Sequence, residues 1–361
     1  MSGNNDPQIT GRRKVVGWLL VLVSFFGVVA ASLAPARYVI HSPGTVIDVF
    51  GELDKKPIIS IDGAKTYPTT GEFDVLTVYV RGEPGNLPTW AEVIAAYFNS
   101  DQVLTPYDTV YAPDENKTQH DAEVSKMMLD SQRDAIAVAL RKSGYTFKSW
   151  LAVDAVIGGR PADGLFKPDD IIKSVNGVEP QSLQDVTGQI EKLNGKPVDF
   201  EILRGGKPKT ITVTPMFDEQ IGRYRVGLQL NFRYDFPFDV KVDLGDVTGP
   251  SAGLTFTLGI IDSLDARSLT SGNKVAATGT ISADGSVGGI GGVQLKMKAA
   301  LASGAKFMLA PIANCDEIVG HVPSGLQVVA VKNIDDALAA LEQLAIEKKP
   351  PTTTQLGCPT R

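Results

Sequence analysis

The sequence predicts an α+β protein that is preceded by one transmembrane helix, and three stretches support this expectation. An uncharged, almost wholly apolar run extends from Val15 to Ala34. The stretch from Phe73 to Val80 is β-branched and aromatic, which is typical of a strand. From Asp121 to Lys142 apolar residues recur at three- and four-residue spacing, which is typical of a helix, and Gly144 follows as a stop signal. The chain after the apolar run therefore contains both kinds of element.

Composition and charge restrict the partners that we expect. The 361 residues are enough for about two to three domains, and 43% hydrophobic with 21% charged residues is ordinary for a globular protein. A net charge of −6 provides no basic field for nucleic acid. No Gly-x-x-x-x-Gly-Lys-Ser/Thr phosphate loop occurs, and the glycines at 288, 289, 291 and 292 miss the spacing Gly-x-Gly-x-x-Gly. We therefore expect no nucleic acid, no ATP, no cofactor and no metal.

The apolar run from Val15 to Ala34 has the length of a membrane span. Twenty residues at about 1.5 Å each reach about 30 Å, the thickness of the hydrocarbon layer. Three basic residues, Arg12 to Lys14, precede it and predict a cytoplasmic N-terminus with the rest of the chain outside. The small residues from Ala30 to Ala34 leave a cleavable signal peptide as the alternative, but the run is longer than a usual signal core.

Two cysteines, Cys315 and Cys358, fit an exported chain, in which an even count permits one disulfide. Such a bond would hold the C-terminal tail against the preceding domain, and two free thiols are the alternative. Their spacing does not match a zinc site.

The stretch from Gly249 to Gly253 reads Gly-Pro-Ser-Ala-Gly and precedes an apolar run, Leu254 to Leu264, that predicts a helix. Small residues around Ser251 let a substrate backbone approach the hydroxyl, and a helix N-terminus offers backbone N–H groups to a developing oxyanion. A glycine-rich block that ends at Lys296 follows downstream. The pair indicates a serine nucleophile with a lysine base.

Two other readings of this stretch stay open. Gly249-x-Ser251-x-Gly253 also fits the nucleophile elbow of an α/β-hydrolase esterase, which requires an acid and then a histidine after the serine. The only histidine in that part is His321, with Asp316 five residues before it. A simple turn with a helix cap is the structural alternative.

Three motifs in order resemble the proteolytic domain of the Lon family: Gly-Pro-Ser-Ala-Gly, then Ala277-Thr278-Gly279, then the block from Gly285 to Lys296. The resemblance implies that Ser251 is the nucleophile, Lys296 the general base and Thr278 the threonine beside them, with Gly249 and Pro250 in support. Thr248 departs from the acidic residue of the ATP-dependent members. A looser match covers Pro43-Gly44, Leu76 to Val78, and the helix from Met128 to Ala135, and it implies a packing role for Ser131.

Residues 148–216 resemble a bacterial PDZ domain, through Gly159-Arg160-Pro161-Ala162, Pro168 to Ile172 and Val175-Asn176-Gly177. The resemblance implies that an extended peptide adds to a sheet edge. The nearest candidate for a carboxylate-binding loop is Gly144 to Phe147. Taken together, the two resemblances imply a PDZ domain inserted into a Lon-type domain, although a segment that only spaces its neighbours is the alternative.

A lysine base must be neutral, and lowering its pKa from about 10.4 to about 7 requires about 4 to 5 kcal/mol against the charged form, which burial can supply. At about 100° per residue, Lys296 borders the apolar face of its predicted helix, about 60° from Val293. Lys298 lies further round that helix and is expected to be solvated.

The predicted function is an ATP-independent serine endopeptidase that cleaves extracytoplasmic or membrane-associated polypeptides docked through the PDZ domain, with homo-oligomerisation left open. The alternative from another class is a non-catalytic scaffold or chaperone on a protease-like fold. The predicted divisions are a cytoplasmic N-terminus 1–14, an anchor 15–34, an N-terminal Lon-type part 35–147, a PDZ domain 148–216, a catalytic part 217–346 and a tail 347–361.

Overall fold

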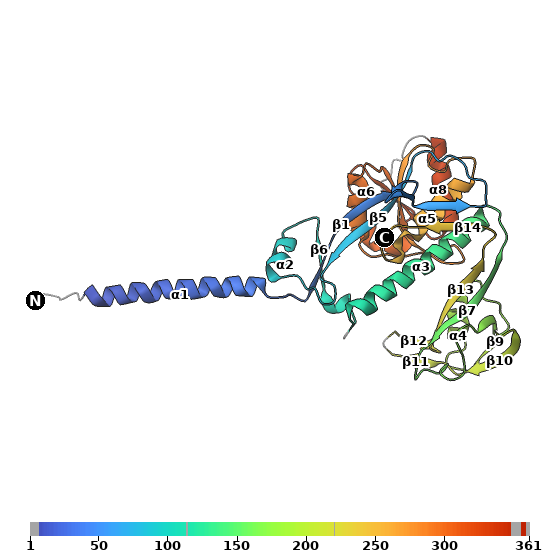
Figure 1. Cartoon of the computed structure of the whole chain (residues 1–361), viewed down its shortest axis with the longest axis horizontal. Coiled ribbons are helices and arrows are strands. Elements are labelled where there is room, and N and C mark those ends of the chain that lie inside the picture. The colour runs from blue at the N-terminus through green and yellow to red at the C-terminus, as the bar shows by residue number, and fades with distance from the viewer. Residues whose placement is uncertain (1–6, 113–114, 220, 348–354, 359–361) are drawn as a thin grey trace, which may run out of the picture. The chain divides into compact units, whose positions relative to one another are not determined.

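The computed structural model describes residues 7–112, 115–219, 221–347 and 355–358 (Figure 1). Residues 1–6 of the predicted N-terminal segment, and 348–354 and 359–361 of the predicted tail, lie outside the described residues. The chain forms two compact units, one made of 1–44 with 78–122 and the other of 45–77 with 123–361. Each unit is described below by itself.

The first unit contains a long N-terminal helix, a short helix and parts of three strands. Strands β1 and β5 and helix α3 each continue from this unit into the second. Its elements are α1 (Pro7–Leu33), β1 (Tyr38–Asp48), β5 (Glu72–Arg81), α2 (Trp90–Tyr97), β6 (Val103–Pro106), the 3-10 turn η1 (Tyr107–Thr109) and the start of α3 (Lys117–Lys142).

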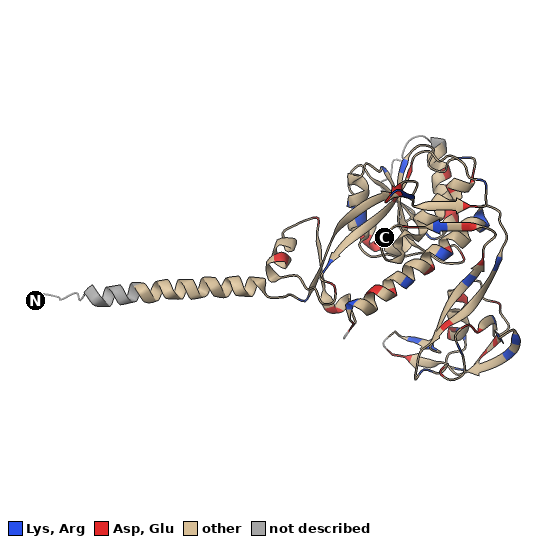
Figure 2. Ribbon diagram, viewed as in Figure 1, with Lys and Arg blue, Asp and Glu red and all other residues tan. Residues whose placement is uncertain are grey.

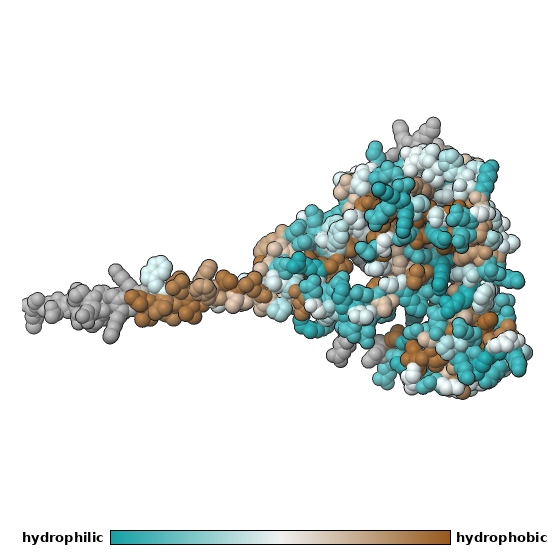
Figure 3. Space-filling view, viewed as in Figure 1, coloured by the Kyte–Doolittle hydropathy of each residue, from teal (hydrophilic) through white to brown (hydrophobic). Residues whose placement is uncertain are grey.

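Helix α1 contains the one described stretch that is long and apolar enough to cross a membrane, Val15–Leu33. Its 19 residues extend about 28 Å at the helical rise. Figure 2 shows that this stretch carries no charged residue, and Figure 3 shows apolar side chains along it. The large side chains of Val15–Leu33 are all exposed, so no described part of the unit buries this stretch.

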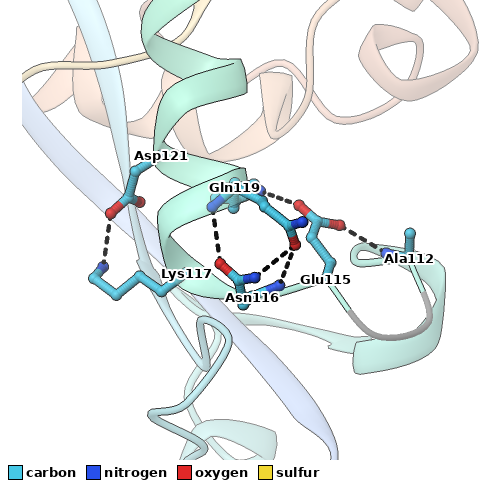
Figure 4. A network of polar contacts seen from close by, with 7 residues as sticks. Ala112, Glu115, Asn116, Lys117, Gln119 and Asp121 are labelled. Atoms are coloured by element: carbon cyan, nitrogen blue, oxygen red, sulfur yellow. Dashed lines mark hydrogen bonds and ion pairs between the residues drawn. The ribbon is translucent and has the colours of Figure 1, made fainter. Parts of the chain in front are cut away.

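Helix α3 begins at a reciprocal hydrogen-bonded cap (Figure 4). Asn116 Oδ1 accepts from the Gln119 N–H at 3.0 Å, and Gln119 Oε1 accepts from the Asn116 N–H at 3.2 Å. The cap satisfies N–H groups that the first turn of a helix leaves without partners. Glu115 accepts from the Ala112 N–H at 2.8 Å and contacts the His120 imidazole, which ties the preceding loop to the helix.

Within the described residues, the second unit contains strands and helices around two larger sheets, with four two-stranded sheets beside them. Its remaining strands are β2 (Glu52–Leu53), β3 (Lys56–Pro57), β4 (Ile59–Asp62), β7 (Lys148–Val156), β8 (Ile171–Val175), β9 (Val198–Arg204), β10 (Lys207–Val213), β11 (Met216–Asp218), β12 (Arg223–Arg225), β13 (Leu228–Asp235), β14 (Asp239–Val242), β15 (Lys274–Ala277), β16 (Thr280–Ile281), β17 (Val287–Gly288), β18 (Phe307–Pro311), β19 (Gln327–Val331) and β20 (Gln355–Leu356). Its helices and 3-10 turns are α4 (Leu183–Lys192), η2 (Pro250–Ala252), α5 (Gly253–Leu264), α6 (Val293–Ala302), η3 (Ile312–Asn314), α7 (Cys315–Ile318) and α8 (Ile334–Glu347).

The larger sheet of this unit runs in the order β20-β19-β18-β15-β5, and these neighbours are all parallel. Parallel strands are buried on both faces, which fits the short apolar strands β15 and β18. Helix α5 carries no charged residue before Asp262 and is buried along nearly its whole length. It confirms the predicted helix over Leu254–Leu264 and starts one residue earlier.

Residues 148–235 form a second sheet with its own core. Its order is β10-β9-β8-β7-β13, and all four pairings are antiparallel. Apolar side chains of these strands pack with Val186 and Ile190 of α4. Strand β13, which follows the predicted end of this region at residue 216, occupies the last position of the sheet.

A disulfide joins Cys315, at the start of α7, to Cys358 in the tail, with 5.6 Å between the Cα atoms. The cross-link spans 43 positions of sequence. The disulfide therefore bonds the described part of the tail to the start of α7, as the pair of cysteines permits.

Candidate active site

Ser251 lies in a tight turn that leads directly into buried helix α5. Gly249 has φ of +92°, a backbone conformation that L side chains rarely adopt, so glycine is required there. Pro250 begins the 3-10 turn η2, where its fixed φ suits the first helical position. The Ser251 carbonyl accepts from the Gly279 N–H at 2.8 Å. The turn therefore has its backbone held on both sides of Ser251.

Lys296 lies in the first turn of α6, which the glycine-rich block positions. Gly292 has left-handed φ of 69° at the N-cap, and its carbonyl accepts from the Lys296 N–H at 3.0 Å. The side chain is only 2% exposed, although lysine is almost never fully buried. Its Nζ lies 2.7 Å from Ser251 Oγ and 3.0 Å from Thr278 Oγ1. The structure therefore brings these three predicted side chains into one hydrogen-bonded group.

Burial lowers the pKa of Lys296 to about 8, because removal from water disfavours the ammonium form. No ion pair joins Lys296 to a carboxylate among the residues that the structure describes, so no negative charge offsets this effect. Lys298, two residues further along α6, is partly exposed. The difference follows the helical face on which each lysine lies.

Thr278 follows strand β15 directly and is fully buried. Its N–H donates to the Leu309 carbonyl of β18 at 3.0 Å, which fixes its backbone to the parallel sheet. Its Oγ1–H donates to the Ser251 carbonyl at 3.1 Å, and the same oxygen is 3.0 Å from Lys296 Nζ. Thr278 therefore connects the serine turn with the lysine.

Ser131 contacts the site in a way that the sequence did not indicate. It lies on helix α3, is buried, and its Oγ–H donates to the Pro250 carbonyl at 2.9 Å. A Cβ on Gly253 would lie 2.5 Å from this oxygen, which explains why residue 253 is glycine. The looser resemblance implied only a packing role for Ser131. The one signal in the sequence for a contact with the site was a hydroxyl at a helical position that faces the core.

Asn314 is a second residue that the sequence analysis missed. Its Oδ1 accepts from the Ile290 N–H at 3.0 Å, and its Nδ2 donates to the Ile290 carbonyl at 2.8 Å. The buried amide thus closes the glycine-rich loop before α6 from both sides. Nothing in its local sequence identifies this partner, which lies 24 positions away.

The other candidates lie apart from this group. His321 is exposed after α7, and the hydrogen bond of Ser251 Oγ goes to Lys296 and not to an imidazole. These contacts therefore do not assemble the serine, acid and histidine that an α/β-hydrolase esterase requires. Within the described ranges, no three His, Cys, Asp or Glu side chains come together in a way that could hold a metal ion.

A serine hydroxyl beside a buried lysine can act as a nucleophile next to a base, which is the requirement for covalent acyl transfer. Residues 234–343, which include all three side chains, match the family described as the Lon protease (S16) C-terminal proteolytic domain. Lon protease 2 of Bacillus subtilis (strain 168) is 38% identical over 104 residues, 29% of this chain and 17% of that protein. A Lon protease of Buchnera aphidicola is 33% identical over 131 residues, 35% of this chain and 16% of that protein.

The matched region is similar to a proteolytic domain of the serine-peptidase class. More particularly, the similarity is to the Lon protease (S16) C-terminal proteolytic domain, and it extends over residues 234–343. The chain spans 17% or less of the length of these two Lon relatives.

A solved structure to which the chain is similar is the PDZ domain of an SdrC-like protein from Listeria innocua. The match has a TM-score of 0.21 and 22% sequence identity, and it covers 22% of this chain and 92% of that one.

Proposed function

We propose that this protein is an ATP-independent serine endopeptidase in which Ser251 is the nucleophile and Lys296 the general base. The observation that carries the proposal is the 2.7 Å separation between Ser251 Oγ and the Nζ of a lysine that is buried and unpaired with any described carboxylate. A base must lie within hydrogen-bond reach of the proton that it removes, and its pKa must lie near the working pH. Both conditions are supported by this arrangement.

In the proposed reaction, neutral Lys296 accepts the proton of Ser251 Oγ–H while Oγ forms a bond to the scissile carbonyl carbon. The resulting ammonium then gives that proton to the leaving amine as the peptide C–N bond breaks. Water hydrolyses the acyl-enzyme in the second half, with Lys296 again as base. Thr278 accepts a hydrogen bond from Nζ and so holds the lysine towards Ser251 in both protonation states.

The proposed oxyanion site is formed by backbone N–H groups at the start of the Ser251 turn. The N–H and C=O of a trans peptide point in opposite directions. The hydrogen bond from Ser131 to the Pro250 carbonyl therefore sets the direction of the Ser251 N–H. A donor held in advance where negative charge develops stabilises a transition state more than the ground state.

Four single variants of the full chain test the dyad on one peptide substrate and with a fluorophosphonate that labels activated serines. We expect kcat/KM to fall about 10²-fold to 10⁴-fold in each of Ser251→Ala, Lys296→Ala and Lys296→Arg. The first removes the nucleophile and the second removes the base. The third fails because arginine keeps its proton at any usable pH. Lys298→Ala is the matched control on the same helix and should retain activity. Circular dichroism checks that each variant is folded.

Three results would contradict the dyad. Full activity in Lys296→Ala would exclude a lysine base, and loss of activity in His321→Ala would favour the esterase reading. Absence of both peptide cleavage and fluorophosphonate labelling in the folded native chain would favour a non-catalytic scaffold.

We further propose that residues 15–34 anchor the chain in a membrane, with the proteolytic domain outside the cytoplasm. The basic residues Arg12 to Lys14 before the span and the Cys315–Cys358 disulfide support this topology, because disulfides persist in oxidising compartments. Protease added to intact cells should then cut the chain beyond residue 35. Protection until the cells are lysed would contradict the topology, and a mature chain that begins after Ala34 would identify a cleaved signal peptide.

We also propose that the second sheet is a PDZ domain inserted into the Lon-type domain, with substrate polypeptides docking on it. Support comes from strand order: β5 pairs with β15 in one sheet, while the chain between them builds the separate sheet of residues 148–235. Strand β13 is the last strand of that sheet, so its outer edge has no strand partner among the described residues. An extended peptide can add to such an edge.

Competition tests the docking site in the native chain. Short peptides with apolar C-termini should slow the cleavage of protein substrates and leave hydrolysis of a small acyl substrate unchanged, because docking is separate from the dyad. Equal inhibition of both substrates would place the peptides in the active site, and no inhibition of either would leave the segment as a spacer.

A further inference from the structure

Helix α2 of the first unit exposes an apolar face that no described part of the unit covers. Trp90 is 42% exposed, Ile94 54% and Tyr97 75%, and the C-cap residue Phe98 is 81% exposed. At about 100° per residue these four side chains lie within an arc of about 100°, so they form one face. We call Trp90, Ile94, Tyr97 and Phe98 the α2 face.

The side of α2 next to the α2 face is fixed to its own unit. Val93 and Ala96 are buried, and Thr89 caps the helix through a hydrogen bond with the Glu92 N–H. Glu92 is the only charged residue of α2, and its carboxylate accepts from the Thr89 N–H at 2.8 Å and pairs with Arg81. The apolar character of the α2 face is therefore not balanced by charge on that face.

Backbone hydrogen bonds hold α2 at the end of the candidate membrane span. The Trp90 N–H donates to the carbonyl of Ala34, one residue after the span ends at Leu33, at 3.1 Å. The Ala36 N–H donates to the Pro88 carbonyl at 2.8 Å, and the Trp90 ring packs edge-on against Tyr38. Figure 1 shows α2 beside this end of α1. The start of α2 is thereby fixed at the depth where the apolar run stops.

That depth corresponds to the interface between hydrocarbon and water when α1 spans a bilayer. Tryptophan and tyrosine are enriched there because an apolar ring with a polar atom suits a boundary between the two media. A contiguous group of exposed large apolar side chains is unusual on a protein surface and indicates a binding surface. The composition of the α2 face and its place at the end of the span both fit lipid.

We propose that the α2 face rests in the interfacial layer of the membrane that α1 crosses. The inference rests on the proposed membrane anchor and adds a second lipid contact to it. Burial of Trp90, Ile94, Tyr97 and Phe98 among lipid headgroups and upper acyl chains fixes the first unit against the bilayer surface. The span then acts as one part of a two-point attachment and not as a flexible tether.

The chain has three tryptophans, which allow the anchor and the α2 face to be tested separately. The full chain is reconstituted into phosphatidylcholine vesicles in two single-tryptophan forms. Trp90→Phe with Trp150→Phe leaves Trp18, which lies within the span. Trp18→Phe with Trp150→Phe leaves Trp90. Vesicles contain lipids brominated either near the headgroup or near the bilayer centre, and bromine quenches nearby tryptophan emission.

Trp18 emission should be quenched by brominated lipid, which establishes insertion of the span. Trp90 emission should shift to shorter wavelength on reconstitution and be quenched more by bromine near the headgroup than by bromine at the centre. Adding Tyr97→Gln and Phe98→Gln to the Trp90 form should remove most of both effects. Tyr79→Gln, which changes an exposed tyrosine of β5 outside the α2 face, is the matched control and should leave both effects unchanged.

Three outcomes would overturn the inference. Quenching of Trp18 without quenching of Trp90 would reject the α2 contact and leave the anchor standing. Absence of quenching at both positions would reject the anchor and the α2 contact together. Shielding of Trp90 from aqueous acrylamide without bromine quenching would show that protein, such as a second copy of the chain, covers this face.

Discussion

The surroundings of Lys296 and the face of α2 depart in opposite directions from the usual distribution of side chains. Lys296 is a charged residue type with 2% exposure, whereas Phe98 is an aromatic residue with 81% exposure. Folded proteins normally bury the second kind and expose the first. Each placement costs free energy in water. A functional role is one reason why a protein keeps such a placement.

The difference lies in what compensates each departure. Lys296 has two hydroxyl partners within the protein, so its burial is partly satisfied by the fold itself. The α2 face has no covering group among the described residues of its unit, so any compensation must come from outside the chain. A charged side chain that is buried within the protein indicates chemistry at a site. An apolar face that the protein leaves exposed indicates a contact surface.

The strongest test of the first departure is Lys296→Met, which should remove activity and increase stability. The pKa of Lys296 in the folded chain, about 8, lies below the 10.5 of a free lysine side chain. This difference destabilises the folded state by about 3 kcal/mol at pH values below 8. Methionine removes this cost but loses two hydrogen bonds, so we expect a net gain of about 1 to 2 kcal/mol near pH 7. Urea unfolding of the native chain and of Lys296→Met measures this difference in the free energy of unfolding.

The control for this prediction is the pH dependence of stability. Between pH 8 and 10.5 the unfolded chain binds more protons at Lys296 than the folded chain, so native stability should rise with pH in that window. The rise attributable to this group should be absent from Lys296→Met. A Lys296→Met protein that is less stable than the native chain at pH 7 would show that the lysine is not held under a burial penalty.

The rate of peptide hydrolysis should rise with pH as Lys296 loses its proton. With a pKa of about 8, the neutral fraction increases about tenfold between pH 7 and pH 9. The logarithm of kcat/KM should therefore rise and then level off near pH 9, with stability monitored in parallel. A profile with its midpoint near 6.5 would instead indicate a histidine base.

Ser131→Ala should have a smaller effect that separates positioning from packing. Loss of the bond to the Pro250 carbonyl frees the direction of the Ser251 N–H, so we expect kcat to fall about fivefold to tenfold, or about 1 to 1.4 kcal/mol, with KM little changed. Ser131→Cys keeps the volume and a weak donor, and partial recovery of kcat is expected. Equal kcat in all three proteins would leave Ser131 a packing residue.

The smallest effect is expected at the α2 face. Tyr97→Gln and Phe98→Gln remove exposed side chains, so each should change the free energy of unfolding by less than about 0.5 kcal/mol. Thermal unfolding of a form released from the membrane, in solution without detergent, measures this change. The corresponding change in a buried position of α2, Val93→Gln, should cost several kcal/mol. A large loss at Tyr97 would show that this residue supports the fold, and would weaken the contrast with Lys296.

Local sequence was sufficient for several elements of this protein. Apolar periodicity and stop signals act over a few neighbouring residues. They were enough to predict the apolar run, the helix after Ser251, the strand around Leu76 and the helix that ends at Lys142. The resemblance of three motifs to the Lon family also named Ser251, Thr278 and Lys296 together. Their grouping could be expected from resemblance, while their distances could not.

The contacts of Ser131 and Asn314 were beyond sequence reasoning. Ser131 reaches Pro250 across 119 positions of sequence, and Asn314 reaches Ile290 across 24. Such partners depend on how helices and strands pack after the chain has turned, and no local pattern encodes them. The Cys315–Cys358 pair is an intermediate case, since an even count of two left only one possible intramolecular bond.

The sequence by itself named the side chains for which we propose chemistry, and it identified the stretch that is apolar enough for a membrane. Only the tertiary structure decided that Lys296 is the buried lysine of its helix, that Thr278 joins it to Ser251, and that one face of α2 remains uncovered. The physical reason is that burial is a property of packed surfaces. It depends on every segment that meets a residue, and most of those segments are far away along the chain.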